Sequence, residues 1–393
     1  MDFEFSEEQR RFQAEVEKFL EERRSPEVMD RNPEQLSQTV DTPPKRALMR
    51  ELAERGWLGM SWPAEYGGRE LPGSYDFLLT EALAREGAPQ PGKGVGIVGR
   101  TIIRHGNDGL KRLFLPRIIR GEIEFAIGYS EPEAGSDAAA MALKAVRDDE
   151  RRGWVLNGRK VWTTSAHFAD WYWVGARTDQ ESKHRGITLF LVEMDHPGLT
   201  VQPTWTIGDE RTNEVFFDDV FVSDDFVVGR VNEGWTYICE ALDLERFAMM
   251  PIGPVERKIE TLRDYLASSE RDGVLLRDDP CVRRALARLV TDLEVARMLQ
   301  RQVVALAVKG GVPTVESSMY KLFMTELGQR VADTALDMMG PCAQLKAGEP
   351  DAPVNGRFER SYRYTVVDTI GGGSSEIQKN IIARRGLGLP RNF

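Results

Sequence analysis

Residues 154–162 read WVLNGRKVW, and this stretch marks a change in the period of the sequence. β-Branched and aromatic residues flank an Asn-Gly pair, which is a strong short-range signal for a two-residue hairpin turn. Further short segments rich in β-branched and aromatic residues follow at residues 170–177, 186–194, 199–207 and 213–222. The pattern predicts a hairpin turn at Asn157 and Gly158, inside a small antiparallel barrel or sandwich.

Helical patterns lie on both sides of this β region. Apolar residues recur at helical spacing from Phe5 to Leu20, with Ser6 as a plausible N-cap. Further helices are predicted before the β region at residues 45–55, 75–87, 98–105 and 110–121. Long amphipathic segments follow it at residues 235–250, 254–268, 280–309 and 317–339. Residues 271–279 and 348–356 are interpreted as insertions between helices.

The order of these zones predicts an α+β multidomain protein. We expect an N-terminal helical domain over residues 1–125, a middle antiparallel β-barrel or sandwich domain over 126–235, and a C-terminal four-helix-bundle domain over 236–393. With 393 residues and 41% hydrophobic residues, the chain can bury cores of this size.

The composition excludes several classes of function. The net charge is −10, and an acidic chain repels phosphate backbones, so nucleic acid is not an expected partner. The three cysteines form no CxxC pair and the four histidines are scattered, so no metal site is expected. No apolar run approaches the roughly 18 residues of a membrane span, and the acidic N-terminus is unlike a signal peptide. We therefore expect a cytoplasmic protein in a reducing compartment that does not bind membranes.

Two stretches of the β region carry hydroxyls and small residues beside an aromatic ring. Residues 126–137 read AIGYSEPEAGSD and residues 160–166 read KVWTTSA. Such residues at strand ends suit a flat polar ring, on which Trp162 could stack while Thr164 offers a hydroxyl to a ring nitrogen. The same residues also fit an ordinary turn and a core tryptophan.

A glycine-rich stretch, GGGSSEIQ at residues 371–378, precedes a further helical segment. Glycines before a helix let backbone N–H groups approach an anion, although many such stretches are only turns. No GxGxxG follows a strand and no GxxxxGK[ST] is present, so Rossmann and P-loop sites are not predicted.

Several motifs, taken in order along essentially the whole chain, resemble the acyl-CoA dehydrogenase family. They are GWxG and PxxYGG within residues 56–68, SEPxAGSD at 130–137, NGxKxWxT at 157–164 and SxEIQxxIxAR at 374–384. The resemblance implies the fold of that family, FAD as cofactor and an acyl-CoA thioester as substrate, oxidised across its α and β carbons. It also implies an electron-transfer flavoprotein as electron acceptor.

The resemblance assigns roles to individual residues. The flavin ring and ribityl chain are expected to contact Ile127, Tyr129, Ser130, Gly135, Ser136, Trp162, Thr163 and Thr164. Among these, Ser130 matches a position at the pyrimidine edge, Thr164 a donor to flavin N5, and Ser136 a position that also meets the CoA thioester arm. Ser374 and Glu376 match positions that contact the adenosine half of FAD.

The usual catalytic base of the family is missing. In most members a Glu lies two residues before the position matched by Ser374, and this chain has Gly372 there. A minority of the family carries the base on the first long C-terminal helix in an LxxER pattern, which matches LDLER at residues 242–246. Glu245 is therefore the predicted base. Glu245 could instead only pair with an Arg on a helix face, and Asp243 is a further candidate.

The same comparison implies contacts to the substrate. Besides Ser136, these are expected from Asp243, Arg246, Gly372 and Gly373. The N–H of Gly372 and a flavin ribityl hydroxyl are expected to polarise the thioester carbonyl.

A second departure concerns assembly. Family members usually complete a neighbour's FAD site with an RxxFG element and a GGxG turn, but this chain reads ERDGV at residues 270–274 and MGPCA at 339–343. We therefore expect an α2β2 heterotetramer with a homologous second subunit, or otherwise a homo-oligomer with a remodelled adenosine site.

These departures also bear on the substrate. They resemble actinobacterial dehydrogenases of steroid side-chain CoA thioesters, and glycine at residues 371–373 leaves room for a bulky or branched acyl group. Two alternatives stay open: a flavin-dependent monooxygenase on the same fold, and a non-catalytic scaffold subunit of a heteromeric dehydrogenase.

Overall fold

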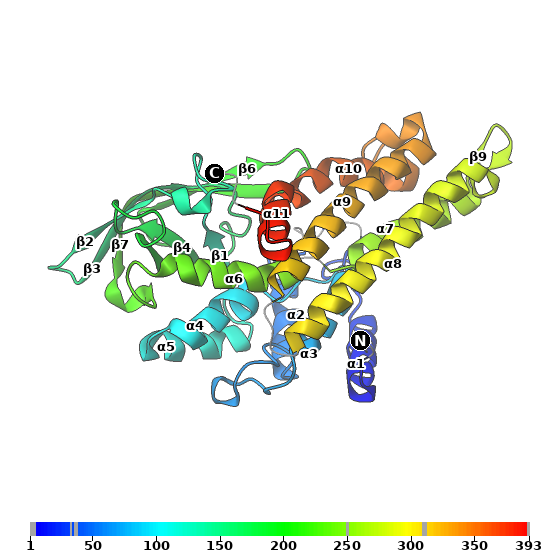
Figure 1. Ribbon diagram of the computed structural model, residues 1–393. Coiled ribbons are helices and arrows are strands. Elements are labelled where there is room, and N and C mark those ends of the chain that lie inside the picture. Colours follow the sequence, from blue (N-terminus) through cyan, green and yellow to red (C-terminus); the bar gives the residue numbers. More distant parts are fainter. Residues whose placement is uncertain (1–4, 32–33, 35–37, 249–250, 309–312, 391–393) are drawn as a thin grey trace.

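In the chain, helices precede and follow a β-sheet, which lies toward one end of an elongated molecule (Figure 1). The structure is a computed structural model that describes residues 5–31, 34, 38–248, 251–308 and 313–390, and within residues 243–248 it describes the backbone alone. The predicted order of helical, β and helical zones is confirmed. The domain boundaries after residues 125 and 235 stay a prediction.

The N-terminal helices pack in two groups. Their bounds are α1 Glu7–Glu22, α2 Pro43–Glu54, α3 Ser74–Glu86, α4 Gly99–His105 and α5 Asp108–Ile119, with a π-helical turn η3 at Gly94–Val98. Helices α2 and α3 pack around α1, while α4 and α5 pack against the sheet. The predicted cap is confirmed, because the Ser6 hydroxyl accepts the N–H of Gln9 and the Gln9 side chain accepts the N–H of Ser6. Phe12 and Phe19 of α1 both meet Trp57 edge-on, which fixes α1 on the rest of this zone.

The central sheet is mixed, not purely antiparallel as predicted. Its strands are β1 Phe125–Gly128, β2 Lys144–Asp148, β3 Gly153–Lys160, β4 Trp171–Arg177, β5 Ile187–Glu193, β6 Leu199–Trp205, β7 Arg211–Ser223 and β8 Val227–Val228. The order is β6-β7-β3-β2-β4-β5-β8, and β1 pairs with β4 off this path. Strands β1 and β2 both run parallel to β4, while the other pairs are antiparallel.

The predicted hairpin turn at Asn157 and Gly158 is wrong. Strand β3 runs straight through both residues, and the register against β7 shifts between Leu156 and Gly158. The Asn157 side chain accepts the N–H of Asp219 on β7 and donates to its carboxylate, both at 2.9 Å. Asp219 and Gly158 have φ of 48° and 138°, so the pair of residues marks a β-bulge. Pairing on both edges of β3 outweighs the local turn preference.

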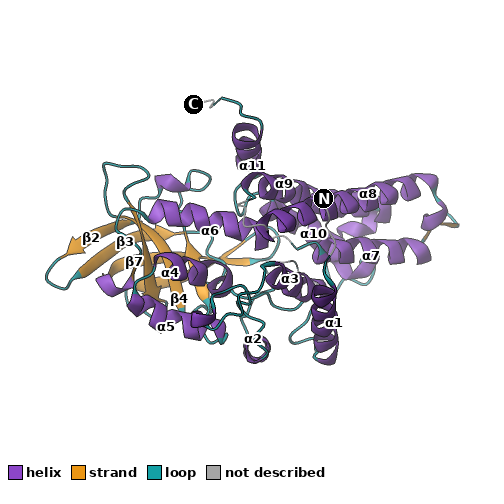
Figure 2. Cartoon of the chain, turned by 60° about the horizontal axis from the view of Figure 1, so that its bottom comes forward, coloured by secondary structure: helices purple, strands orange, loops and turns teal. Residues whose placement is uncertain are grey.

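The sheet curls so that its inner faces meet. Trp154 of β3 lies 6.0 Å from Phe190 of β5, and Tyr172 of β4 lies 5.8 Å from Phe217 of β7, both measured between ring centroids. Next to Tyr172, Trp171 points to the outer face of β4, where it meets Phe114 of α5. Figure 2 shows α4, α5 and α6 beside this part of the sheet. Strand β4 is therefore buried on both faces.

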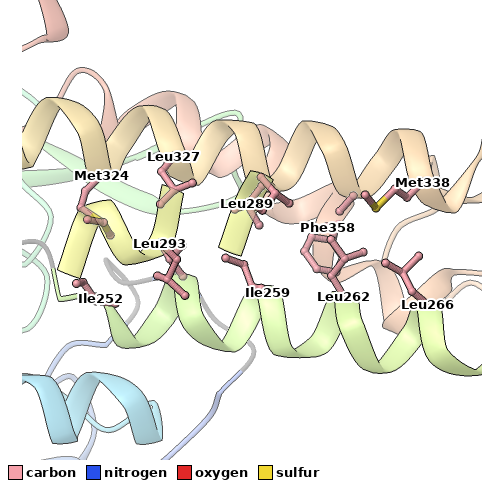
Figure 3. Packing of buried hydrophobic residues seen from close by; sticks show 14 of the residues in the cluster. Ile252, Ile259, Leu262, Leu266, Leu289, Leu293, Met324, Leu327, Met338 and Phe358 are labelled. Carbon is pink, nitrogen blue, oxygen red and sulfur yellow. The ribbon is translucent and has the colours of Figure 1, made fainter. Parts of the chain in front are cut away.

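The C-terminal zone is a bundle with one continuous core. Its helices are α6 Gly234–Ala248, α7 Gly253–Ser268, α8 Pro280–Val308, α9 Thr314–Met339, α10 Arg357–Asp368 and α11 Ser375–Ile381. Buried side chains of α7, α8, α9 and α10 meet in this core (Figure 3). Helix α10 was not predicted, because two of its core positions carry the hydroxyls of Ser361 and Thr365. Part of the expected insertion at residues 271–279 forms a hairpin, β9 Glu270–Arg271 with β10 Val274–Leu275.

Two valines of α8 offer a matched test of this core. Val303 is 0% exposed and Val290 is 43% exposed. We expect Val303→Ala to lower the free energy of unfolding by about 1–3 kcal/mol, because it removes buried methyl groups and leaves a cavity. Val290→Ala should change it by less than about 0.5 kcal/mol. Urea midpoints of the two variants measure the difference, and equal midpoints would contradict the packing described for α8.

Candidate active site

The loops that follow β1 and β3 lie side by side. The N–H of Val161 donates to the carbonyl of Ser130 at 3.0 Å, and the ammonium of Lys160 donates to the carbonyl of Tyr129 at 3.3 Å. Ile127 lies in β1 opposite Trp173, whose indole N–H donates to the Tyr129 hydroxyl at 2.8 Å. The structure thus brings together the two stretches that the sequence marked for a flat polar ring.

Trp162 has a backbone conformation that a bulky residue rarely adopts. Its φ is 60°, in the left-handed region, and its side chain is 60% exposed. Such a conformation costs about 1–3 kcal/mol and tends to be kept where a site needs it. The interpretation of Trp162 as a core residue is therefore wrong, and the indole is left accessible to a ligand.

The residues next to Trp162 differ in exposure. Thr163 is buried, with its hydroxyl 2.8 Å from the Tyr172 hydroxyl and its N–H on the carbonyl of Asn213 at 3.0 Å. The Asn213 amide also donates to the Thr163 carbonyl at 2.8 Å, and together these bonds anchor the strained turn. Thr164 is half-buried. A Cβ at residue 128 would lie 2.4 Å from the Tyr172 hydroxyl, which explains why the last residue of β1 is glycine.

A buried ion pair fixes these loops. Lys160 is 0% exposed and its ammonium lies 2.7 Å from the carboxylate of Glu131. That carboxylate also accepts the N–H groups of Ala142 and Leu143. Burial lowers the pKa of Lys160, although the carboxylate of Glu131 opposes the shift. The sequence pattern contained both residues but did not indicate that they pair.

Gly135 and Ser136 lie in the exposed loop that follows Glu131 in the chain. A Cβ at Gly135 would meet nothing within 4 Å. Asp137, next in the chain, forms an ion pair with Lys183 at 2.6 Å. The loop therefore presents small residues and a hydroxyl to solvent.

The glycine-rich stretch is held by its carbonyl groups. Lys321 of α9 is 1% exposed and donates to the carbonyls of Asp368 and Gly373 at 2.9 and 2.8 Å. The Gln378 amide donates to the carbonyls of Gly372 and Gly373 at 3.2 and 3.0 Å. Gly372 and Gly373 have φ of 66° and 92°, which explains glycine at both positions. Burial also raises the pKa of Asp368 to about 7.

Ser374 and Glu376 lie at the start of α11. The Ser374 hydroxyl accepts the N–H of Ile377 at 3.4 Å and caps this helix. Glu376 is exposed, and hydrogen bonds from its own N–H and from Ser374 lower the pKa of its carboxyl group. A carboxylate at this place is therefore ionised at neutral pH.

A cavity of about 540 Å³ lies between the N-terminal helices and the start of the C-terminal bundle. Its walls come from the loop before α3, from α3, η3 and α4, and from the last turns of α8. Val95 of η3 lines it and also packs on the hydrophobic cluster that Tyr129 and Leu242 join. Val95 therefore links the cavity wall to the hydrophobic cluster on which Tyr129, in the loop after β1, also packs.

Helix α6 borders this cavity. Glu240 of α6 and Pro251 just after the helix both line it. Asp243, Glu245 and Arg246 lie between these two positions in the chain, and their side chains fall outside the described part of the structure. The predicted base is thus on a helix next to the cavity, while its carboxylate position stays a prediction.

The cavity wall contains charged residues that the sequence did not single out. Arg100 donates to the Ser61 hydroxyl at 2.7 Å and to the Asp76 carboxylate at 3.1 Å. Glu81 accepts the N–H of Ile252 at 3.1 Å, and burial raises the pKa of Glu81 to about 7. In the sequence these charged residues stand inside otherwise apolar helical patterns. That contrast was the signal that could have marked them as residues of a site.

The two stretches expected to serve a neighbouring subunit meet within this chain. The Arg271 guanidinium donates to the carbonyl of Met338 at 2.5 Å. A Cβ at Gly340 would lie 3.6 Å from the same guanidinium. Arg271 therefore caps the carboxyl end of α9 in its own chain.

Neither a metal site nor a membrane span is found in the part of the chain that the structure describes. No group of three or more His, Cys, Asp or Glu side chains could hold a metal ion there. No helix there is long and apolar enough to cross a membrane.

Family models match the chain in three consecutive segments. They are the acyl-CoA dehydrogenase N-terminal domain at residues 6–122, the middle domain at 126–220 and the C-terminal domain at 232–387. Acyl-CoA dehydrogenase FadE26 of Mycobacterium tuberculosis is 34% identical over 355 residues, which cover 88% of each chain.

Two solved structures are similar over the whole chain. They are described as the Tcur3481-Tcur3483 steroid ACAD and as the ChsE4-ChsE5 complex from Mycobacterium tuberculosis. Each is 32% identical, with a TM-score of 0.88 and 100% coverage of both chains.

Breaking the buried ion pair tests its role at the site. We expect Lys160→Met to lower the free energy of unfolding by about 3–5 kcal/mol, because it leaves the Glu131 carboxylate buried without a cation. Adding Glu131→Gln should recover part of this loss, since the charge is then removed. Lys379→Met, at an exposed ion pair, is the control and should cost less than about 1 kcal/mol. Urea unfolding measures all three, and a small effect of Lys160→Met would contradict the argument.

Proposed function

This chain belongs to the acyl-CoA dehydrogenase family and is an acyl-CoA dehydrogenase. From that premise we propose that it uses FAD and that Glu245 is the base that takes the α-proton from the substrate. The observation that carries the proposal is the position of α6. Glu240 and Pro251, which precede and follow the LDLER segment in the chain, both line the cavity, and this supports a base on α6.

The residues present fit FAD. The exposed indole of Trp162 offers a flat apolar face, and its strained backbone has no structural need that the described contacts reveal. Hydroxyl and small residues surround it, and the residues that would hold the flavin and ribityl chain are Ile127, Tyr129, Ser130, Gly135, Ser136, Trp162, Thr163 and Thr164. Ser374 and Glu376 would contact the adenosine half. When bound, FAD accepts the hydride that leaves the β carbon.

The remaining steps belong to this chain. The N–H of Gly372 would polarise the thioester carbonyl and so lower the barrier to losing the α-proton. Lys321 and Gln378 hold the carbonyls of Gly372 and Gly373, so the loop that carries this N–H is restrained before substrate binds. Glu245 would take the proton, and desolvation by bound substrate would raise its basicity. Asp243, Arg246, Gly373 and Ser136 are proposed further substrate contacts.

A bulky acyl group is the proposed substrate class. The cavity of about 540 Å³ falls in the usual range for ligand pockets. The similar structure described as a steroid ACAD supports a steroid side-chain thioester. An electron-transfer flavoprotein is the proposed electron acceptor.

A homologous second subunit is the proposed partner, in an α2β2 assembly. Arg271 bonds to Met338 in its own chain, so the guanidinium that would serve a neighbour's FAD site is already engaged. A similar structure is described as a complex of two differently named chains, ChsE4 and ChsE5, which supports the same arrangement.

Replacing the base tests the mechanism. We expect Glu245→Gln to lower kcat by roughly 10²- to 10⁴-fold, with flavin content unchanged, because an amide cannot accept the α-proton. Turnover is measured on acyl- and steroid-CoA thioesters with an artificial electron acceptor, with and without the partner subunit. Asp243→Asn tests the rival carboxylate, and Glu294→Gln on the exposed side of α8 is the control. Unchanged turnover of Glu245→Gln would remove Glu245 from the mechanism and favour the monooxygenase or scaffold alternatives.

Expression of the chain alone tests the assembly. We expect well under one FAD per chain and recovery of flavin when the second subunit is co-expressed. Size-exclusion chromatography and flavin absorbance measure both quantities. A stable homo-oligomer with one FAD per chain would rule the heteromer out.

A further inference from the structure

The cavity beside α6 is lined by residues other than those expected at the thioester. Its described lining includes none of Ser130, Trp162, Thr164 or Gly372. Its far wall is built from α3 and α4, which carry Asp76 and Arg100. With the cavity taken as the acyl site, the remote end of an acyl group would meet these helices.

Arg100 is held in this wall as a fixed hydrogen-bond donor. One of its terminal nitrogens donates to both Ser61 and Asp76. Asp76 is itself fixed, because it accepts the N–H of Met60 at 3.1 Å and the hydroxyl of Ser61. A guanidinium carries five N–H donors, and the other two nitrogens of Arg100 have no protein partner among the described residues. Donors thus remain for a ligand.

The charges of this wall nearly cancel. Arg100 faces Asp76 at 3.1 Å, and Arg104 lies 3.8 Å from Glu240. Glu81 adds a buried carboxyl group that already accepts the Ile252 N–H and the Gln300 amide. A carboxylate on the ligand would meet no net positive charge here, whereas a neutral oxygen would gain the free donors of Arg100 without a Coulombic penalty.

We propose that this wall is a distal subsite that selects acyl groups bearing a neutral acceptor oxygen, a carbonyl or a hydroxyl, at the end remote from the thioester, with Arg100 as the donor. The inference rests on the proposed function, because it takes the cavity as the acyl site. Apolar residues that line the same cavity, such as Phe77, Val95 and Val304, would hold the hydrocarbon body. A plain alkyl group would leave the donors of Arg100 without a partner, which is costly inside a pocket.

Three matched thioesters test the subsite. They are 3-cyclohexylpropanoyl-CoA and its 4-oxo and 4-carboxy derivatives, assayed with an artificial electron acceptor on the flavin-loaded enzyme in the assembly in which it purifies. We expect kcat/KM for the 4-oxo compound to exceed that for the plain compound by roughly 10- to 100-fold. The 4-carboxy compound should be no better than the plain one.

Variants of Arg100 identify the donor. In Arg100→Met the preference for the 4-oxo compound should fall to about one, while Arg112→Met, an exposed position on α5, should keep it. Should Arg100→Met fail to fold, Arg100→Lys keeps a charge opposite Asp76 but loses the planar fork, and it should lower the preference at least about fivefold.

The outcomes distinguish a failure of the subsite from a failure of the proposed function. Equal kcat/KM for the plain and 4-oxo compounds, a preference for the 4-carboxy compound, or a preference that survives the Arg100 substitution would overturn the subsite while dehydrogenation stands. Absence of turnover with these thioesters and with straight-chain and steroid-acid thioesters would instead overturn the proposed function.

Discussion

A lysine and a glutamate buried together fix the edge of the sheet on which the site depends. Lys160 ends β3, Glu131 follows β1, and the carboxylate also accepts the N–H groups of Ala142 and Leu143 just before β2. Removing either charge alone would leave the other in a medium of low dielectric constant. Three segments are therefore held in one arrangement, and the strained turn at Trp162 starts from it.

Opposite this rigid edge, helices supply the rest of the site. The glycine-rich stretch has no side chains of its own, and buried groups on α9 and α11 hold its carbonyls. Helix α6 borders the cavity and carries Glu245, the base that we propose in place of the one missing at residue 372. The same cavity is lined by Arg100 of α4 and Asp76 of α3, so the proposed selection of the acyl group would fall on helices other than α6.

Sequence motifs and local propensity differed in what they could predict. Content of β-branched and aromatic residues predicted β4 to β7 within a few residues, because such side chains favour a pleated, buried surface. The predicted turn at Asn157 and Gly158 was wrong, because β3 pairs with a strand on each of its edges. That pairing keeps the two residues in the strand, where they form a bulge. Some residues of the family motifs serve packing rather than chemistry. A Cβ at Gly68 would lie 2.0 Å from the carbonyl of Trp62, so a side chain does not fit there.

The sequence by itself determined the order of the zones, the family and the residue types available for chemistry, because periodicity and motifs are local properties of the chain. Only the tertiary structure decided which of these residues meet. Lys160 and Glu131 are 29 positions apart, and Arg100 and Asp76 are 24 apart, with no local pattern that links either pair. Burial of charge makes these pairings compulsory, and burial is a property of the folded chain alone.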